Sequence, residues 1–123
     1  MTILIFGIGV DISQIKRIWN IYQSHKNFID YILTLKEIEF FNDLSLKKKM
    51  EFLSGRFSAK ESYSKAYGTG IGNNIGWKDI EILNNYMGKP IITNHPFKGN
   101  AFVSISHTDQ LVFTEVILER SGN

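Results

Sequence analysis

The amino-acid sequence contains no cysteine. Disulfide bonds, thiolate metal sites and cysteine nucleophiles are therefore excluded. Long hydrophobic runs are missing as well, and no stretch approaches the roughly 20 apolar residues that a membrane-spanning helix needs. The formal net charge is only +2, too small for charge alone to predict nucleic acid as a partner. Any basic surface must therefore be local.

What the sequence does contain is typical of an ordinary globular domain. Hydrophobic residues make up 43% of it and charged residues 21%. The 123 residues fit one domain, 1–123, and leave no room for a second core. The apolar start lacks the positively charged leading region of a signal peptide and reaches Asp11 after a short run. We therefore expect a single cytoplasmic domain with no membrane segment.

The first half of the sequence predicts one strand followed by helices. Residues 3–10 have the branched side chains of a buried strand, which glycines loosen at its end. A helix follows from about residue 15, with Ser13 as its candidate N-cap. The next helix is predicted to start at Thr34, because Thr34 and Glu37 have the spacing of a capping box.

The longest predicted helix covers residues 45–67. Apolar residues lie on two of its faces, at positions 46, 50, 53 and 57 and at positions 52, 59, 63 and 66. A helix that is apolar on two faces should lie at the centre of the domain. Gly68 suits the left-handed conformation that ends many helices. The glycines at 70 and 72 would let a backbone approach a ligand, but this segment follows a helix and lacks the end of a P-loop, so a helix stop is the simpler reading.

The second half of the sequence predicts strands. Short segments of β-type residues lie at 80–82 and 91–92, and longer ones lie at 101–106 and 111–119. The last two are joined through four residues, most simply as a hairpin. One strand, then helices, then strands is the order of an α+β fold, here with a long central helix and a C-terminal antiparallel sheet.

Two carboxylates stand where the apolar pattern makes them unusual. Asp11 follows the first apolar strand, where it either helps to cap the next helix or binds a ligand. Glu61 continues an apolar stripe of the long helix by one helical step, so a charge takes the place of a hydrophobic residue. Carboxylates are rarely buried unless they are paired or bind a metal. An ordinary helix pair with Lys65, four residues later, is the alternative for Glu61.

Two carboxylates without a soft ligand suit Mg²⁺, which binds one or two protein carboxylates together with water and substrate phosphate. Lys65 would then be a positive charge near the same phosphates. Arg56 and Lys60 on the same helix, with the lysines at 47–49, form either a solvated face or a contact surface for a polyphosphate or an acidic protein. His107, in the loop between the last two strands, is either a turn residue or a ligand contact.

Several segments together resemble the holo-acyl-carrier-protein synthases, the short single-domain type of 4'-phosphopantetheinyl transferase. The segments occur in the family's order and extend nearly from end to end of the chain. They are residues 7–12 (GIGVDI), 52–66 (FLSGRFSAKESYSKA), 68–72 (GTGIG), 77–82 (WKDIEI), 88–90 (GKP) and 103–108 (VSISHT). The stretch from 56 to 65 is the most specific, whereas residues 23–41 and 94–100 match poorly.

The resemblance implies a phosphopantetheinyl-transferase-like fold and an activity. Such an enzyme moves 4'-phosphopantetheine from coenzyme A to a serine of apo acyl carrier protein in fatty acid biosynthesis, and 3',5'-ADP leaves. The resemblance further implies that Asp11 and Glu61 bind Mg²⁺ and that Glu61, directly or through water, helps to deprotonate the serine. It gives Lys65 the role of stabilising the leaving group.

The same resemblance implies binding residues and an assembly. Arg17 is the implied contact for the acidic carrier protein. The family is typically a homotrimer with sites between subunits, and neither nucleic acid nor a membrane is expected as a partner. The implied coenzyme A contacts are Arg56, Lys65, Lys89, Ser106, His107 and Thr108.

Two alternatives stay open on the sequence. A non-catalytic binding module for a nucleotide or an acidic protein would use the basic helix and leave Glu61 paired with Lys65. Magnesium dependence separates that module from an enzyme, because only the enzyme needs a cation held by carboxylates. The second alternative keeps the chemistry and changes the target to a polyketide or peptide-synthetase carrier. Transferases of that kind resemble a tandem duplication of this fold, so the single-domain length favours the fatty-acid type.

Overall fold

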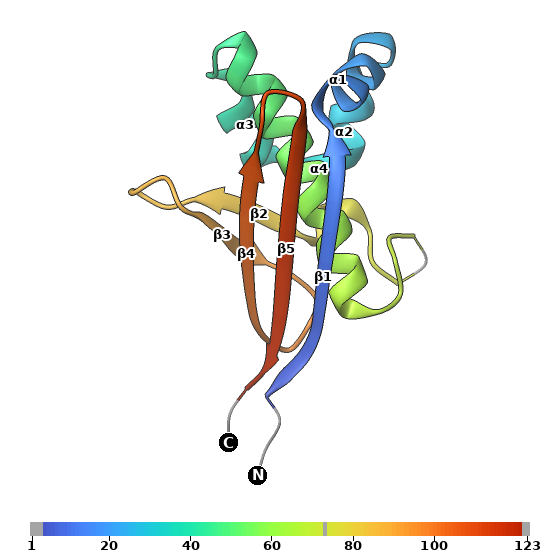
Figure 1. Cartoon of the computed structure of the whole chain (residues 1–123), viewed down its shortest axis with the longest axis vertical. Helices are drawn as coiled ribbons and strands as arrows, with labels where there is room; N and C mark the ends of the chain where they lie inside the picture. The colour runs from blue at the N-terminus through green and yellow to red at the C-terminus, as the bar shows by residue number, and fades with distance from the viewer. Residues whose placement is uncertain (1–3, 73, 122–123) are drawn as a thin grey trace.

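The structure, a computed structural model, describes residues 4–72 and 74–121. Ile3, the first residue of the predicted first strand, lies outside the described residues. The described chain has the predicted α+β order of one strand, then helices, then strands (Figure 1). Its elements are β1 (Ile5–Gln14), α1 (Ile15–Ser24), α2 (Phe28–Ile32), α3 (Leu35–Asn42), α4 (Leu46–Tyr67), the 3₁₀ helix η1 (Trp77–Asp79), β2 (Glu81–Asn84), β3 (Pro90–Asn94), β4 (Gly99–His107) and β5 (Leu111–Arg120).

The main sheet is antiparallel and has the strand order β1-β5-β4, so that β1 and β4 lie on either side of β5. Strands β4 and β5 form the predicted hairpin. The register places Asp11 of β1 opposite Thr114 of β5, and His107 of β4 opposite Val112. Strands β2 and β3 pair separately as a two-stranded ribbon. The long helix α4 runs along one face of the main sheet (Figure 1).

Strand β1 lies unusually close to helix α4. A Cβ atom on Gly7 would collide with the carbonyl oxygen of Ala66, and one on Gly9 would collide with the carbonyl oxygen of Ser62. Glycines within a strand often mark such a close approach of two backbones. The sequence predicted that these glycines loosen the strand. In the structure they let helix α4 pack directly on β1, which brings Asp11 next to α4.

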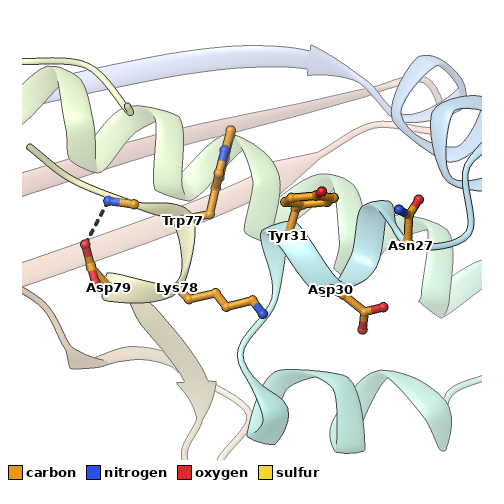
Figure 2. A pocket seen from close by; sticks show the side chains of 7 residues that line it. Asn27, Asp30, Tyr31, Trp77, Lys78 and Asp79 are labelled. Atoms are coloured by element: carbon orange, nitrogen blue, oxygen red, sulfur yellow. Dashed lines mark hydrogen bonds between the residues drawn. The ribbon is translucent and has the colours of Figure 1, made fainter. Parts of the chain in front are cut away.

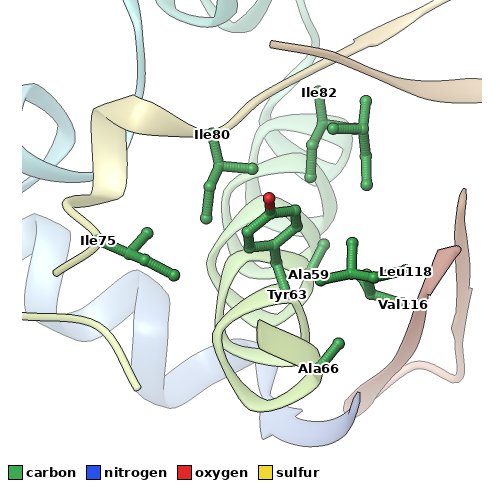
Figure 3. Close-up of a cluster of buried hydrophobic side chains, with 9 residues drawn as sticks. Ala59, Tyr63, Ala66, Ile75, Ile80, Ile82, Val116 and Leu118 are labelled. Carbon is green, nitrogen blue, oxygen red and sulfur yellow. The ribbon is translucent and has the colours of Figure 1, made fainter. Parts of the chain in front are cut away.

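Helix α4 is central, as predicted, and Gly68 ends it with a φ of 104°. Three residues of its second apolar stripe, all except Phe52, belong to the core between the helix, the main sheet and the β2–β3 ribbon (Figure 3). The members of this core are Ala59, Tyr63, Ala66, Ile75, Ile80, Ile82, Ile92, Val116 and Leu118. The other stripe is less regular than predicted, because Leu46 is exposed and Phe57 is only half-buried. Glu61 is half-buried as well.

A second core lies where α1, α2 and α3 pack against the first half of α4. It consists of Ile18, Ile29, Ile32, Leu33, Phe41, Phe52 and Leu53. The predicted capping box at the start of α3 is confirmed, since Thr34 and Glu37 each bind the other's backbone N–H. The prediction that Ser13 caps α1 is wrong: Ser13 belongs to β1, and Gln14 is the N-cap residue without a side-chain hydrogen bond. Helix α2 was not predicted.

The reading of Arg56 and Lys60 as a solvated face is wrong. Both side chains are buried, Lys60 completely. The Lys60 ammonium donates to the Glu37 carboxylate and to the Ile32 carbonyl oxygen, each at 2.7 Å. Glu37 also accepts from the backbone N–H of Ile82 at 2.8 Å. This buried ion pair therefore ties α3 and β2 to the centre of α4. None of the described helices is both long and apolar enough to cross a membrane.

Candidate active site

Asp11 lies on β1 and points towards α4. Its Oδ2 atom accepts two hydroxyl hydrogen bonds, one from Ser13 and one from Ser58, both at 2.8 Å. Its Oδ1 atom faces Lys65, whose ammonium lies 3.4 Å away. The side chain of Asp11 keeps 15% of its surface exposed, so one side of the carboxylate remains open to a ligand.

Glu61 and Lys65 both lie on α4 beside Asp11. The ion pair that Lys65 forms is with Asp11, and its ammonium also donates to the carbonyl oxygen of Val10 at 3.0 Å. The ion pair of Lys65 is therefore with Asp11, while its charge also acts on the Glu61 carboxyl. Burial raises the pKa of the Glu61 carboxyl, the negative charge of Asp11 raises it further, and Lys65 opposes the change. Asp11 and Glu61 are thus close enough for each to feel the other's charge.

The donor atoms of this group fit Mg²⁺. Two carboxylates that repel each other favour a cation between them, and both are hard oxygen ligands. Among residues 4–72 and 74–121, no three His, Cys, Asp or Glu side chains come together as a metal-binding group. A site with two carboxylates matches the usual coordination of Mg²⁺, which keeps several water ligands and binds substrate phosphates.

A second group of predicted residues lies around a cavity of about 340 Å³. Arg56 and His107 line it, and Gly88 and Pro90, on either side of Lys89, line it too. The rings of Phe40 and Phe52 add flat apolar surface. The lining therefore combines cations, an amide side chain and aromatic rings. Asp11, Glu61 and Lys65 are not among the lining residues.

Arg56 is held firmly in the wall of this cavity. It donates to the Ile82 carbonyl oxygen and to Asn84, both at 2.9 Å, and its guanidinium lies 4.2 Å from the centre of the Phe52 ring. Burial lowers its pKa to about 10, and the charge of Glu37 opposes this change. Arg56 thus has a structural role whatever else it binds.

His107 lies at the end of β4 with the predicted residues Ser106 and Thr108. All three line a small cavity of about 190 Å³ together with Ile12 and other apolar side chains. The Nδ1 atom of His107 lies 3.8 Å from a Glu51 carboxylate oxygen. The segment from Ser106 to Thr108 therefore borders two cavities at one end of the sheet.

The predicted site residues thus form two separate groups in one chain. Asp11, Glu61 and Lys65 meet where β1 crosses α4, and His107 lies on β4 beyond β5 (Figure 1). Arg17 belongs to neither group and is exposed on α1.

A further cavity of about 530 Å³ lies between α2 and η1 and contains none of the predicted site residues (Figure 2). The rings of Tyr31 and Trp77 and the charged side chains of Asp30 and Lys78 line it. The carboxylate of Asp79 accepts from the backbone N–H of Gly76 at 2.8 Å and so shapes one wall.

Comparison with known proteins identifies the family. The family model described as the 4'-phosphopantetheinyl transferase superfamily matches residues 7–117. This chain belongs to that superfamily. A holo-[acyl-carrier-protein] synthase of Lacticaseibacillus casei is 55% identical over 119 residues, which cover 97% of this chain and 95% of the relative. One from Limosilactobacillus reuteri is 51% identical over 116 residues, 94% of this chain and 97% of the relative.

Solved structures of superfamily members agree in fold. A holo-(acyl-carrier-protein) synthase from Bacillus anthracis, in complex with CoA (3',5'-ADP), has a TM-score of 0.90 and 39% identity and covers 97% of this chain and 100% of its own. A holo-[acyl-carrier-protein] synthase from Neisseria meningitidis has a TM-score of 0.86 and 31% identity, with 94% of this chain and 99% of its own covered. The phosphopantetheinyl-transferase-like fold that the sequence predicted is confirmed.

The sequence analysis did not identify the buried hydroxyl groups that connect to Asp11. Ser58, Ser62 and Thr114 are all fully buried, and they connect to Asp11 by hydrogen bonds. A signal was present, because serines at 54, 58 and 62 recur every fourth residue of the long helix. Such spacing puts small polar residues on one face of a helix and marks a polar contact inside the domain.

Proposed function

We propose that this chain is a holo-acyl-carrier-protein synthase that acts with Mg²⁺. It transfers 4'-phosphopantetheine from coenzyme A to a serine hydroxyl of an apo acyl carrier protein and releases 3',5'-ADP. The observation that carries the proposal is the meeting of Asp11, Glu61 and Lys65 at the crossing of β1 and α4. Membership of the superfamily and the synthases named among its relatives support the same reaction.

Asp11 and Glu61 would hold the cation, with Asp11 offering Oδ1 because Oδ2 is already bonded to Ser13 and Ser58. When bound, Mg²⁺ supplies positive charge for the pyrophosphate of coenzyme A and for the charge that develops during transfer.

Glu61 is suited to accept the proton of the carrier serine, directly or through a water. A carboxylate within hydrogen-bond reach of the serine hydroxyl can act as its general base. The serine oxygen then forms a bond to the phosphorus that carries the pantetheine. The bond from that phosphorus to the oxygen of 3',5'-ADP breaks, and the electron pair leaves with the ADP. Lys65 stabilises the leaving group by its charge.

Coenzyme A would contact residues from the second group. Arg56 and His107 line the cavity of about 340 Å³, whose aromatic rings suit the adenine base. Lys89 projects from the exposed turn beside this cavity, and Ser106 and Thr108 flank His107. The basic side chains would contact phosphate groups, since ion-assisted hydrogen bonds to phosphate are short and strong.

We place the complete site between subunits of a homotrimer. Within one chain Asp11 lies on β1 and His107 on β4, with β5 between these strands, so a neighbour would have to bring the two groups together. The face of the main sheet opposite α4 also supports assembly. On it lie Ile8, Val10, Ile12, Phe102 and Phe113, which are 44% to 61% exposed. Large exposed apolar faces usually mark an interface, and a head-to-tail contact that closes on itself gives a ring.

The carrier protein would dock at α1 through Arg17, which is exposed there and has a charge opposite to that of an acidic carrier. The host pathway would be fatty acid biosynthesis in the cytoplasm.

The proposed activity is tested by incubating the protein with coenzyme A, MgCl₂ and an apo acyl carrier protein, then measuring the carrier mass. We expect the mass of phosphopantetheine to be added. Asp11→Asn and Glu61→Gln should each remove most of the activity, because both preserve shape and remove charge. Their melting temperatures should match that of the unmodified protein. Full activity in excess chelator contradicts the cation role.

The shared site is tested by mixing two inactive chains. Equal amounts of Asp11→Asn and His107→Ala protein are denatured together and refolded. Random assembly of closed head-to-tail trimers gives about one-quarter of sites with both residues intact. Clear activity should therefore return. No gain over the separately refolded proteins, with mixed trimers present by native mass spectrometry, refutes the arrangement.

A further inference from the structure

The carboxylate of Asp11 ends a chain of buried hydroxyl groups. Ser58 contacts Asp11 Oδ2 at 2.8 Å and Thr114 Oγ1 at 2.8 Å, and Thr114 Oγ1 contacts Ser62 Oγ at 2.6 Å. Ser58, Ser62 and Thr114 are all completely buried. Ser13, which is also buried, provides the second hydroxyl at Oδ2. This series of hydrogen-bonded hydroxyl groups begins inside the domain and ends at the proposed cation site.

The direction of these hydrogen bonds follows from counting protons. An ionised carboxylate can only accept, so Ser58 must give its one proton to Asp11. Ser58 therefore accepts from Thr114, whose one proton is then used. Ser62 must in turn donate towards Thr114, to the hydroxyl oxygen at 2.6 Å or the carbonyl oxygen at 3.2 Å. The Ser58 and Thr114 hydroxyl dipoles thus point the same way, with their positive ends towards Asp11.

The hydroxyl groups also determine which oxygen of Asp11 stays outside their hydrogen bonds. With Ser13 and Ser58 both bonded to Oδ2, the carboxylate cannot rotate without breaking two hydrogen bonds. The Oδ1 atom is left on the side of Lys65. The spacing of Ser58, Glu61, Ser62 and Lys65 puts all four on one face of α4, so the support and the site share one rigid helix.

On the basis of the proposed cation site, we infer that Ser58 is a positioning residue: together with Ser13 it holds the Asp11 carboxylate with Oδ1 presented to a divalent cation. Groups that hydrogen-bond to a ligand carboxylate orient it, and their loss typically weakens metal binding by about 10- to 100-fold. Thr114 and Ser62 complete the support by keeping the Ser58 proton directed at Oδ2.

The chain offers a matched control. Ser54 lies one turn earlier on α4 and is also completely buried. Its hydroxyl donates to the carbonyl oxygens of Met50 and Glu51 within the helix, at 2.8 and 3.2 Å. Ser54→Ala therefore removes a buried hydroxyl from the same helix without touching Asp11. Any effect of Ser58→Ala that Ser54→Ala lacks belongs to the contacts of Ser58 with Asp11 and Thr114.

The test measures cation binding directly. Mn²⁺ replaces Mg²⁺ and is titrated into each variant with coenzyme A present, and free Mn²⁺ is read by electron paramagnetic resonance. A protein-free titration corrects for Mn²⁺ held by coenzyme A alone. Ser58→Ala and, as a second variant, Ser13→Ala should each raise the dissociation constant about 10-fold. Ser54→Ala should leave it unchanged. Melting temperatures without metal report any general loss of structure.

Asp11→Asn separates two kinds of failure. If Asp11→Asn weakens Mn²⁺ binding and both Ser58→Ala and Ser13→Ala bind like the unmodified protein, the positioning role is refuted while the cation site stands. If Asp11→Asn itself binds Mn²⁺ normally, the cation site is wrong and the role of Ser58 falls with it. Equal weakening by Ser54→Ala and Ser58→Ala also overturns the inference, because a buried hydroxyl anywhere on α4 would then have the same effect. In the transferase assay, Ser58→Ala should need more Mg²⁺ and recover most of its turnover at saturation.

Discussion

Replacement of Glu37 by glutamine should destabilise the protein more than any change to an exposed carboxylate. Glu37 and Lys60 are both fully buried and 2.7 Å apart. In Glu37→Gln the Lys60 ammonium stays buried without its partner, and the nearby Arg56 loses the same negative charge. Removing one member of a buried ion pair typically costs about 3–5 kcal/mol. At about 4 °C per kcal/mol for a domain of this size, the melting temperature should fall by about 12–20 °C.

The structure also predicts an asymmetry between the two partners. Lys60→Met leaves the Glu37 carboxylate with two backbone N–H donors, those of Thr34 and Ile82, and with Arg56 nearby. Glu37→Gln instead leaves two buried cations, Lys60 and Arg56, without the negative charge of Glu37. The glutamine variant should therefore be the less stable of the two, and the double variant should recover part of the loss, since contacting residues are not additive.

The dependence on pH gives an independent check. Burial lowers the pKa of Lys60 below its ordinary value of 10.5, and Glu37 opposes this. Without Glu37, the unfolded chain holds the Lys60 proton more tightly than the folded one. The stability deficit of Glu37→Gln should accordingly shrink as the pH rises towards 10.5.

Thermal unfolding, followed by circular dichroism, measures all three effects. Glu39→Gln is the control, because Glu39 is exposed on the same helix. A melting temperature for Glu37→Gln within about 3 °C of that of the unmodified protein contradicts the reasoning. So does a melting temperature that falls further in Lys60→Met than in Glu37→Gln.

Three further predictions concern Lys65, Arg17 and His95. Lys65→Ala should lower turnover at least about 10-fold and change the Michaelis constant for coenzyme A less, because the leaving-group charge develops mainly in the transition state. Normal turnover with weaker coenzyme A binding would mean that Lys65 contacts the bound substrate without stabilising the transition state further. Arg17→Glu should slow carrier use about 10-fold at low salt and less at high salt, with coenzyme A binding unchanged, and a loss that ignores salt would argue against docking there. The Nδ1 atom of His95 lies 2.9 Å from the Tyr63 hydroxyl, and burial lowers the pKa of this histidine. The unfolded chain therefore binds a proton at His95 more readily than the folded one, so the free energy of unfolding should fall as the pH drops below the ordinary pKa of 6.5. His95→Gln should remove that slope in pH-dependent melting, and an unchanged slope would mean that another group titrates.

Local patterns predicted the parts of the fold that depend on nearby residues. The capping box of Thr34 and Glu37 forms within one turn, and Gly68 ends α4 because a glycine readily adopts a positive φ. The pairing of β4 with β5 follows from two apolar segments joined by a short turn. Helix α2 escaped prediction because its five residues are too few to show a helical period.

The sequence by itself also determined that Asp11 and Glu61 stand where an apolar pattern is interrupted, and the resemblance built on such motifs led to the family. What only the tertiary structure decided is which charges are buried and which residues meet. Lys60 looks like any helix lysine until Glu37, 23 positions away, is folded against it. Ser58 has no evident role until β1 lies close enough on α4 for its hydroxyl to reach Asp11. Helical period records only neighbours along one chain segment, whereas burial and hydrogen bonding depend on the surfaces that other segments bring to it.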